Sequence, residues 1–179
     1  DGYNSATGKL SVTETKSIDV ELTPIEVIPD PELSEKVITI DFGKDYGVST
    51  SSYGSGTFTA EGITFGYERL KSYHTSTSEK YMMFEKNQNA MLYNTTAIPG
   101  KITKLEVKTT AGCSANAAYY ISLFTSEKDV HISDGTKLSG KSATVTLTGT
   151  ESDNFSYFNI SKTNNSYNGQ ISTIIITYL

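Results

Sequence analysis

The chain has 179 residues and a net charge of −5, which argues against a nucleic-acid partner because phosphate binding needs a basic face. It contains one cysteine, Cys113, which excludes an intrachain disulfide and a metal site built from several cysteines. No stretch approaches the roughly 20 apolar residues of a membrane-spanning helix. We therefore expect neither a nucleic-acid partner nor a membrane partner.

The first 36 residues are predicted to form a hairpin and a linker. Residues 8–13 and 17–22 alternate apolar and polar side chains, as strands do, and residues 14–16 form the turn between them. We therefore assign residues 1–24 to a β-hairpin. Since an isolated hairpin is only marginally stable in water, it either packs on the rest of the chain or is the end of a further Ig-like domain. Residues 25–36 form the linker. Pro24 directly precedes them and Pro29 and Pro31 lie within them, and these three of the four prolines favour an extended connector.

Residues 37–179 read as a succession of short strands that form one β-sandwich module. Threonine, tyrosine, valine and isoleucine are abundant, turn residues separate the runs, and no segment has a helical period. The predicted strands are residues 37–42, two strands within 56–68 about Glu61-Gly62, and residues 81–86, 90–95, 101–110, 118–126, 142–149, 157–163 and 171–179. Short strands at this spacing predict an all-β fold, an antiparallel β-sandwich of the jelly-roll type.

The apolar pattern also predicts parts of the core. Residues 173–179 are nearly continuous in β-branched side chains, which predicts a central strand buried on both faces. Adjacent side chains of a strand point to opposite faces, so one member of Tyr119-Tyr120 should be buried and the other exposed. The phenylalanines that we expect in the core are Phe42, Phe58, Phe65, Phe124 and Phe155.

Several strings of residues carry a family resemblance. They are VITIDFG, GTFTAEGITFGYE, YMMFEKNQNAMLYNT, GKITKLEVKTT and YFNISKTNNSYNGQISTIIITY. With them, residues 37–179 resemble the C-terminal β-sandwich module of multidomain surface proteins of gut bacteria and of related phage structural proteins. The resemblance implies a sandwich fold and supplies no catalytic residue. The opening string, DGYNSATGKLSVTETKSIDVELTP, resembles the last strands of PEGA or carboxypeptidase-regulatory-like Ig-type domains.

No motif in the sequence points to catalysis. The two histidines, His74 and His131, accompany no G-x-S-x-G motif. The DFG string at residues 41–43 lacks the glycine-rich and catalytic loops of a kinase. We therefore expect a protein that is not an enzyme, with no catalytic residue and no cofactor.

Among metals, the sequence suggests a structural calcium ion. Jelly-roll modules can hold Ca²⁺ in a loop through carboxylates and backbone carbonyl oxygens. Aspartates lie at predicted strand ends or in loops at Asp41, Asp45, Asp129, Asp134 and Asp153. They do not have the spacing of an EF-hand, so the sequence leaves the presence of a metal site open.

Tyrosines are the candidate ligand-binding residues. Sugar-binding modules stack pyranose rings on exposed aromatic side chains, with amide, carboxylate or ammonium groups nearby for the hydroxyls. Of the 12 tyrosines, we select Tyr53, Tyr73, Tyr157 and Tyr167, which lie in loops or at strand ends. The alternative for each is ordinary packing with the hydroxyl at the surface. The chain has no tryptophan, the preferred sugar platform.

Two functions are compatible with these observations. The first is a non-catalytic extracellular module of a bacterial surface protein that binds a glycan or a surface protein, or acts as a spacer. The alternative is a virion structural protein of a phage, such as a head decoration, tail or fibre domain, whose partners are identical or other virion subunits. A fold does not decide between them.

Overall fold

The computed structural model describes residues 34–73, 80–139, 141, 143–149 and 153–179. The chain divides into two units, residues 1–33 and residues 34–179. The predicted hairpin and most of the predicted linker fall in the first unit and lie outside the described residues. The described part of the second unit contains strands and no helix, and accordingly no described helix is long and apolar enough to cross a membrane.

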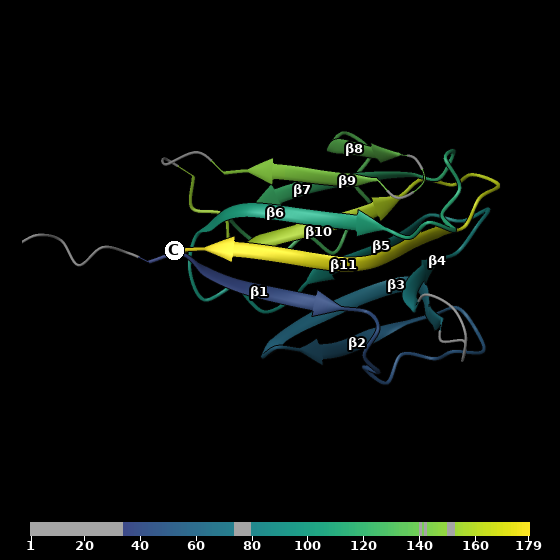
Figure 1. Cartoon of the computed structure of the whole chain (residues 1–179), viewed down its shortest axis with the longest axis horizontal. Helices are drawn as coiled ribbons and strands as arrows, with labels where there is room; N and C mark the ends of the chain where they lie inside the picture. The colour runs from purple at the N-terminus through teal and green to yellow at the C-terminus, as the bar shows by residue number, and fades with distance from the viewer. Residues whose placement is uncertain (1–33, 74–79, 140, 142, 150–152) are drawn as a thin grey trace, which may run out of the picture. The chain divides into compact units, whose positions relative to one another are not determined.

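Eleven strands make up the described part of the second unit, and all their pairings are antiparallel. They are β1 (Lys36–Asp41), β2 (Gly54–Ala60), β3 (Ile63–Tyr73), β4 (Tyr81–Phe84), β5 (Ala90–Asn94), β6 (Ile102–Thr109), β7 (Ala118–Phe124), β8 (Thr136–Ser139), β9 (Thr144–Thr148), β10 (Tyr157–Lys162) and β11 (Gly169–Tyr178) (Figure 1).

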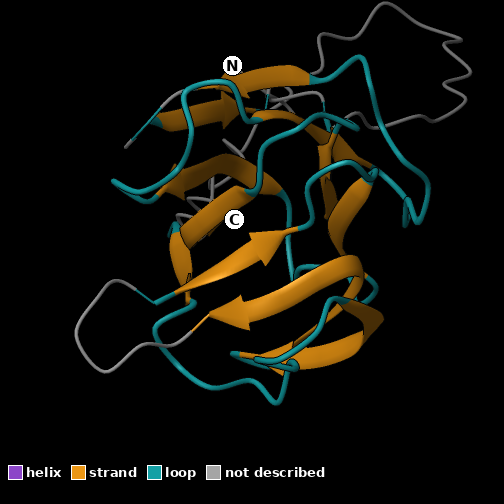
Figure 2. Ribbon diagram, turned by 90° about the vertical axis from the view of Figure 1, so that its right-hand side faces the viewer, coloured by secondary structure: helices purple, strands orange, loops and turns teal. Residues whose placement is uncertain are grey.

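The long strand β3 joins two layers. Hydrogen-bonded neighbours run in the order β8-β7-β10-β5-β3-β4-β11-β6-β9, with β2 on β3 and β1 on β11. The first half of β3 pairs with β5 and its last four residues pair with β4. Between these halves Arg69 has a positive φ of 58°, and such a local bend is how a strand passes from one sheet to another. The first sheet is therefore β8-β7-β10-β5 with the start of β3 and β2, and the second is the end of β3 with β4, β11, β1, β6 and β9. Figure 2 shows the strands without their labels, arranged in layers.

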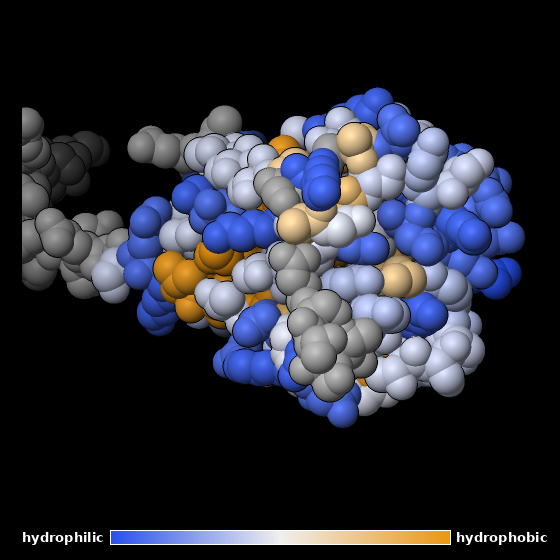
Figure 3. All heavy atoms as spheres, turned by 45° about the vertical axis from the view of Figure 1, so that its right-hand side comes forward, coloured by the Kyte–Doolittle hydropathy of each residue, from blue (hydrophilic) through white to orange (hydrophobic). Residues whose placement is uncertain are grey.

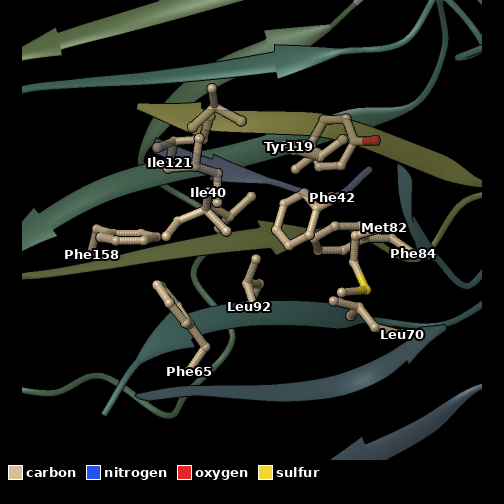
Figure 4. Packing of buried hydrophobic residues seen from close by; sticks show 14 of the residues in the cluster. Ile40, Phe42, Phe65, Leu70, Met82, Phe84, Leu92, Tyr119, Ile121 and Phe158 are labelled. Carbon is tan, nitrogen blue, oxygen red and sulfur yellow. The ribbon is translucent and has the colours of Figure 1, made fainter. Parts of the chain in front are cut away.

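The core lies between the two sheets because alternate residues of each strand are apolar. Figure 4 shows aromatic and aliphatic side chains that meet between the layers, among them Phe65, Leu92 and Phe158. Fully buried residues come from nearly every strand and include Ile40, Phe42, Phe65, Leu70, Met82, Phe84, Leu92, Leu105, Val107, Tyr119, Ile121, Phe158, Ile160, Ile174 and Ile176. Burying each large apolar side chain contributes about 1.5–3 kcal/mol, so this interior is sufficient to hold the sandwich together.

The predicted fold class, an all-β antiparallel sandwich of the jelly-roll type, is confirmed. The prediction that Phe124 lies in the core is wrong. Leu123 packs against the core and Phe124 is its neighbour in β7, so the Phe124 side chain points to the outer face of the first sheet. There it lies under the Lys128 ammonium, which is 5.7 Å from the ring centroid.

Candidate functional site

The surface offers few large hydrophobic side chains. Figure 3 shows one face of the molecule on which hydrophilic residues predominate and hydrophobic ones gather in one area. Among the described residues, the exposed large hydrophobic side chains are Val37, Val130 and Tyr167. A functional surface is therefore better sought among partly exposed aromatic residues with polar neighbours than in an extended apolar patch.

Such a group lies on the outer face of the second sheet, where β3 pairs with β4. In this region Leu70, Ser72 and their neighbours on β4 are buried and face the core. The alternate residues therefore face outward, in the cross-strand pairs Lys71–Met83 and Tyr73–Tyr81. Together with Tyr53, which lies directly before β2, we call these residues the tyrosine patch: Tyr53, Lys71, Tyr73, Tyr81 and Met83.

The rings of the tyrosine patch hold one another in place. Tyr73 and Tyr81 stack with their centroids 5.0 Å apart and an interplanar angle of 18°. The Tyr53 hydroxyl lies 2.8 Å from the Met83 sulfur, and the Lys71 ammonium lies 4.8 Å from the centroid of the Tyr53 ring. Tyr81 and Met83 are almost fully buried, whereas Tyr53 and Tyr73 stay partly exposed. The patch thus has a buried floor and a preorganised aromatic rim.

Asn168 anchors the Tyr53 ring from another part of the chain. Its side-chain oxygen accepts a hydrogen bond from the Tyr53 hydroxyl at 3.1 Å and another from the Lys86 backbone N–H at 2.9 Å. Asn168 directly precedes β11, so it links the patch to the turn after β4 and to the start of the last strand. No local sequence pattern indicates this role, because Asn168 and Tyr53 are 115 positions apart.

Among the described residues, the polar groups around the patch include amides and one opposed pair of charges. Gln170 lies opposite Met83 on β11, and its side-chain oxygen accepts a 2.6 Å hydrogen bond from the Thr110 hydroxyl. Glu85 pairs with Arg69 at 3.5 Å. Because Arg69 is engaged by Glu85, the Lys71 ammonium is the cation that the patch itself contributes. Amide and ammonium donors beside aromatic rings suit a neutral ligand that carries hydroxyls.

Burial also fixes the protonation state of Tyr53. Desolvation by burial, with smaller contributions from the nearby Glu85 and Tyr81, raises the pKa of Tyr53 to about 12. The phenol therefore stays neutral and keeps its hydrogen throughout the physiological range. Its hydrogen bonding to Asn168 and Met83 does not depend on pH there.

The structure brings two of the four selected tyrosines together and leaves two apart. Tyr53 and Tyr73 both belong to the patch. Tyr157 begins β10, pairs with Phe124 and faces out from the first sheet. Tyr167 is 42% exposed and lies next to Asn168 in the chain, and its backbone N–H donates to the Asn165 side chain at 3.1 Å. The participation of all four in ligand binding stays a prediction.

The loop between β7 and β8 covers part of the outer face of the first sheet, over β10. The buried Asn159 side chain donates to the carbonyl oxygens of Lys128 and Val130 at 2.7 and 3.0 Å. The buried Ser161 hydroxyl accepts the Ile132 N–H at 2.9 Å. These bonds lay the loop over β10. Tyr157, at the start of β10, precedes these covered residues.

The described residues do not assemble a metal centre. No group of three or more histidine, cysteine, aspartate or glutamate side chains placed to hold a metal occurs in the part of the chain that the structure describes. Two of the aspartates that the sequence suggested form local turns instead. Asp41 accepts the N–H of Gly43, and Asp45 accepts the N–H of Gly47, both at 2.8 Å. A structural calcium ion stays a prediction.

No protein-family model and no curated protein matches the chain. Among solved structures it is similar to a family 29 carbohydrate-binding module from Piromyces equi, with a TM-score of 0.49 and 9% identity over 82% of this chain and 93% of that one. It is also similar to the C-terminal family 6 carbohydrate-binding module of LamC from Zobellia galactanivorans (TM-score 0.41) and to the K2 adhesin domain of Lys-gingipain (TM-score 0.42). Both share 10% identity over 79% of this chain and 99% of theirs. All of these TM-scores are below 0.5, so the similarity does not establish a function for this chain.

Proposed function

We propose that the chain is a non-catalytic glycan-binding module that acts outside the cell and holds a neutral polysaccharide on the tyrosine patch. The observation that carries the proposal is the group of three tyrosines at the end of β3 and the start of β4. Their rings are fixed by the 5.0 Å stack of Tyr73 on Tyr81 and by the contacts of Tyr53 with Met83 and Asn168. Fixed rings lose little conformational entropy when a ligand binds, which favours affinity.

The chemistry around the rings supports a sugar rather than an ion. A pyranose ring has apolar C–H faces that pack on aromatic rings, and hydroxyls that need hydrogen-bond partners. The Gln170 amide and the Lys71 ammonium lie beside the rings and can serve those hydroxyls. The nearby carboxylate of Glu85 is opposed by Arg69, so Lys71 is the charged group that the described part of the patch offers to a ligand.

The absence of catalysis and the extracellular location are parts of the same proposal. Hydrolysis of a glycan usually needs two carboxyl groups at a defined separation across the scissile bond, and Glu85 is the one carboxylate among the described residues that acts on the Tyr53 ring. Polysaccharides that a module of this kind could bind lie outside cells or on their surface. A structural role in a virion remains the alternative prediction, and no contact within the described residues favours it.

A binding panel tests the proposal. We expect the chain to be retarded in native gels that contain one or more neutral polysaccharides, such as xylan, galactan, β-glucan or mannan. The Tyr73→Ala variant should lose at least about tenfold in affinity, because it removes one of the two partly exposed rings of the patch. Tyr53→Phe should bind more weakly by a smaller factor, since it keeps the ring and loses the bond to Asn168.

Tyr157→Ala is the matched control, because Tyr157 is also a partly exposed strand tyrosine but lies on the other sheet. Its affinity should equal that of the unaltered chain. Thermal unfolding of every variant checks that each one folds. A loss of binding in Tyr157→Ala with none in Tyr73→Ala would move the ligand to the first sheet. No retardation in any polysaccharide would leave the glycan-binding function without support.

A further inference from the structure

The sandwich has four described strands that pair on one side only: β1, β2, β8 and β9. Proteins usually protect such edges with charges, bulges or very short strands, because an open edge invites another strand to pair with it. β1 carries Lys36 and Asp41, β2 has a shift in register between Gly54 and Gly56, and β8 is four residues long and contains Lys137. β9 has none of these devices: its five residues, TVTLT, are uncharged and pair with β6 in unbroken register.

The hydrogen bonds to β6 show which groups of β9 face the open side. The Gly149 N–H donates to the Thr103 carbonyl oxygen, and the Thr109 N–H donates to the Ala143 carbonyl oxygen, both at 3.0 Å. In an antiparallel ladder, the residues that bond to one neighbour alternate along the strand. The odd-numbered residues of β9 therefore bond to β6.

The three threonines of β9 are the residues that face away from β6. Thr144, Thr146 and Thr148 consequently present their backbone N–H and C=O groups at the open edge, and all three residues are exposed. Val145 and Leu147, which alternate with them, pack against the core. The edge is thus a short, well-anchored ladder that has no partner strand among the described residues.

We propose that two copies of this chain associate through β9, antiparallel and about a twofold axis at Thr146. The strand is nearly self-complementary, since its pattern of threonine and aliphatic residues reads the same in both directions. In this pairing Thr146 faces Thr146 of the second copy, and Thr144 faces Thr148. These are the residues whose backbone groups are free, so about six hydrogen bonds form between the chains.

Side chains agree with the same pairing on both faces of the sheet. On the outer face, threonine meets threonine, which is a favourable cross-strand pair. On the inner side, Val145 meets Leu147 of the second copy, and no like charges come together. A twofold axis uses one patch on both copies, which is the commonest symmetry of protein dimers. The association joins the second sheets of the two copies into one sheet.

Thr146→Pro is the variant that tests this association. Proline removes an N–H that β6 does not use, and an edge strand accepts proline at such a position. Thr39→Pro in β1 is the matched control. The Phe42 N–H donates to the Ser172 carbonyl oxygen at 3.0 Å, so the even-numbered residues of β1 bond to β11 and Thr39 also faces an open edge. Thr146→Lys serves as a second variant, because it places two like charges together at the axis and leaves the backbone unchanged.

Sedimentation of the full chain at concentrations up to about 1 mM gives the readout. We expect a reversible dimer for the unaltered chain and for Thr39→Pro, and a monomer for Thr146→Pro and Thr146→Lys. A monomer for the unaltered chain overturns the proposal, even if a strand of a different protein is later found to bind at the β9 edge. A dimer that persists in both Thr146 variants also overturns it, because another surface then holds the two copies together.

Cysteine cross-linking tests the register. Paired residues in a ladder have Cα atoms about 5.5 Å apart, which suits a disulfide, and the native Cys113 is buried. Thr146→Cys should form a disulfide dimer under mild oxidation. Thr148→Cys should not form one, because residue 148 pairs with Thr144 of the second copy. The two cysteines at position 148 then lie on opposite sides of the axis, four residues apart along the ladder. Equal cross-linking of both variants contradicts the twofold register.

Discussion

At the scale of single residues, Lys162 is the side chain least suited to its surroundings. It is fully buried in β10, between Ala90 of β5 and Tyr119 of β7. Its ammonium donates to the adjacent Thr163 carbonyl oxygen at 2.9 Å. Burial lowers the pKa of Lys162 to about 8, although the nearby Glu85 acts in the opposite direction. The charged form is therefore less stable in the folded chain than in water.

Lys162→Met should raise the free energy of unfolding at pH 7 by about 2–3 kcal/mol. The folded pKa lies below the unfolded value of 10.5, so the unfolded chain binds more protons between about pH 8 and 10.5 and stability is lost as the pH falls through this window. Methionine carries no charge, so the variant avoids this loss of stability. It also lacks the hydrogen bond to the Thr163 carbonyl oxygen, which is worth about 1 kcal/mol. Urea unfolding at pH 7 and at pH 10 compares the two chains, and the advantage of methionine should shrink at the higher pH. A difference that is independent of pH would show that Lys162 is not the group responsible.

Asn168 gives a second prediction at this scale, because it acts on the ligand only through Tyr53. Asn168→Ala should lower glycan affinity several-fold, since it removes the acceptor for both the Tyr53 hydroxyl and the Lys86 N–H. Asn168→Asp keeps an oxygen in that place and should retain the affinity. Calorimetric titration with the polysaccharide that binds the unaltered chain measures both. Equal losses in the two variants would argue against a positioning role.

At the scale of elements, the contact between β3 and β5 depends on a glycine. A Cβ atom at Gly66 would meet the Tyr93 ring of the neighbouring strand, 2.6 Å from its hydroxyl oxygen. Because Gly66 has no side chain, the Tyr93 ring can lie close to its backbone on the outer face of the first sheet. Gly54, also in an edge pairing with β3, has no heavy atom within 4 Å of its Cβ position.

Gly66→Ala should consequently destabilise the fold by roughly 1–3 kcal/mol, as overpacking of a tight contact does. Gly54→Ala, the matched control, should change the free energy of unfolding by less than about 1 kcal/mol. Chemical denaturation measures both variants. In the double variant Gly66→Ala with Tyr93→Ser, the alanine should cost less than it does alone. Additive effects would mean that the ring is not what excludes the methyl group.

Most of the strands could be predicted from alternation and turn residues, because both are local signals. The turn at Glu61-Gly62, for example, is formed with positive φ at both residues. β8 was missed, since its four residues carry too short a pattern to recognise. The last strand is central as predicted, but Thr173 and Ile175 on its outer face are only partly buried, so its continuous β-branched run does not mean burial on both faces.

The candidate site was predictable only in part. Tyr53 and Tyr73 could be selected because they lie at strand ends, but Tyr81 and Met83 look like ordinary core residues in the sequence. Their place on the outer face follows from the register of β3 on β4. That register depends in turn on the bend at Arg69. No local sequence pattern predicts a left-handed backbone conformation at an arginine. Long-range partners such as Asn168 are likewise set by the topology.

At the scale of the whole sandwich, the two sheets present different surfaces. The loop between β7 and β8 lies over β10 of the first sheet through Asn159 and Ser161. The second sheet carries the tyrosine patch at one side and the open strand β9 at the other, with β11 and β6 between them. A β9 dimer would therefore leave both patches uncovered. Two patches on one assembly would bind a long polysaccharide more tightly than one.

The tyrosine patch is the surface on which we propose that a neutral glycan binds. Backbone amide chemical-shift mapping tests it most directly, with an oligosaccharide of the polysaccharide that binds in the panel titrated into ¹⁵N-labelled chain. We expect the largest shifts at residues 53, 71–73, 81–83 and 168–170, and small shifts at Tyr157 and along β10. Shifts centred on the first sheet around Tyr157, or none at saturating sugar, would contradict the account.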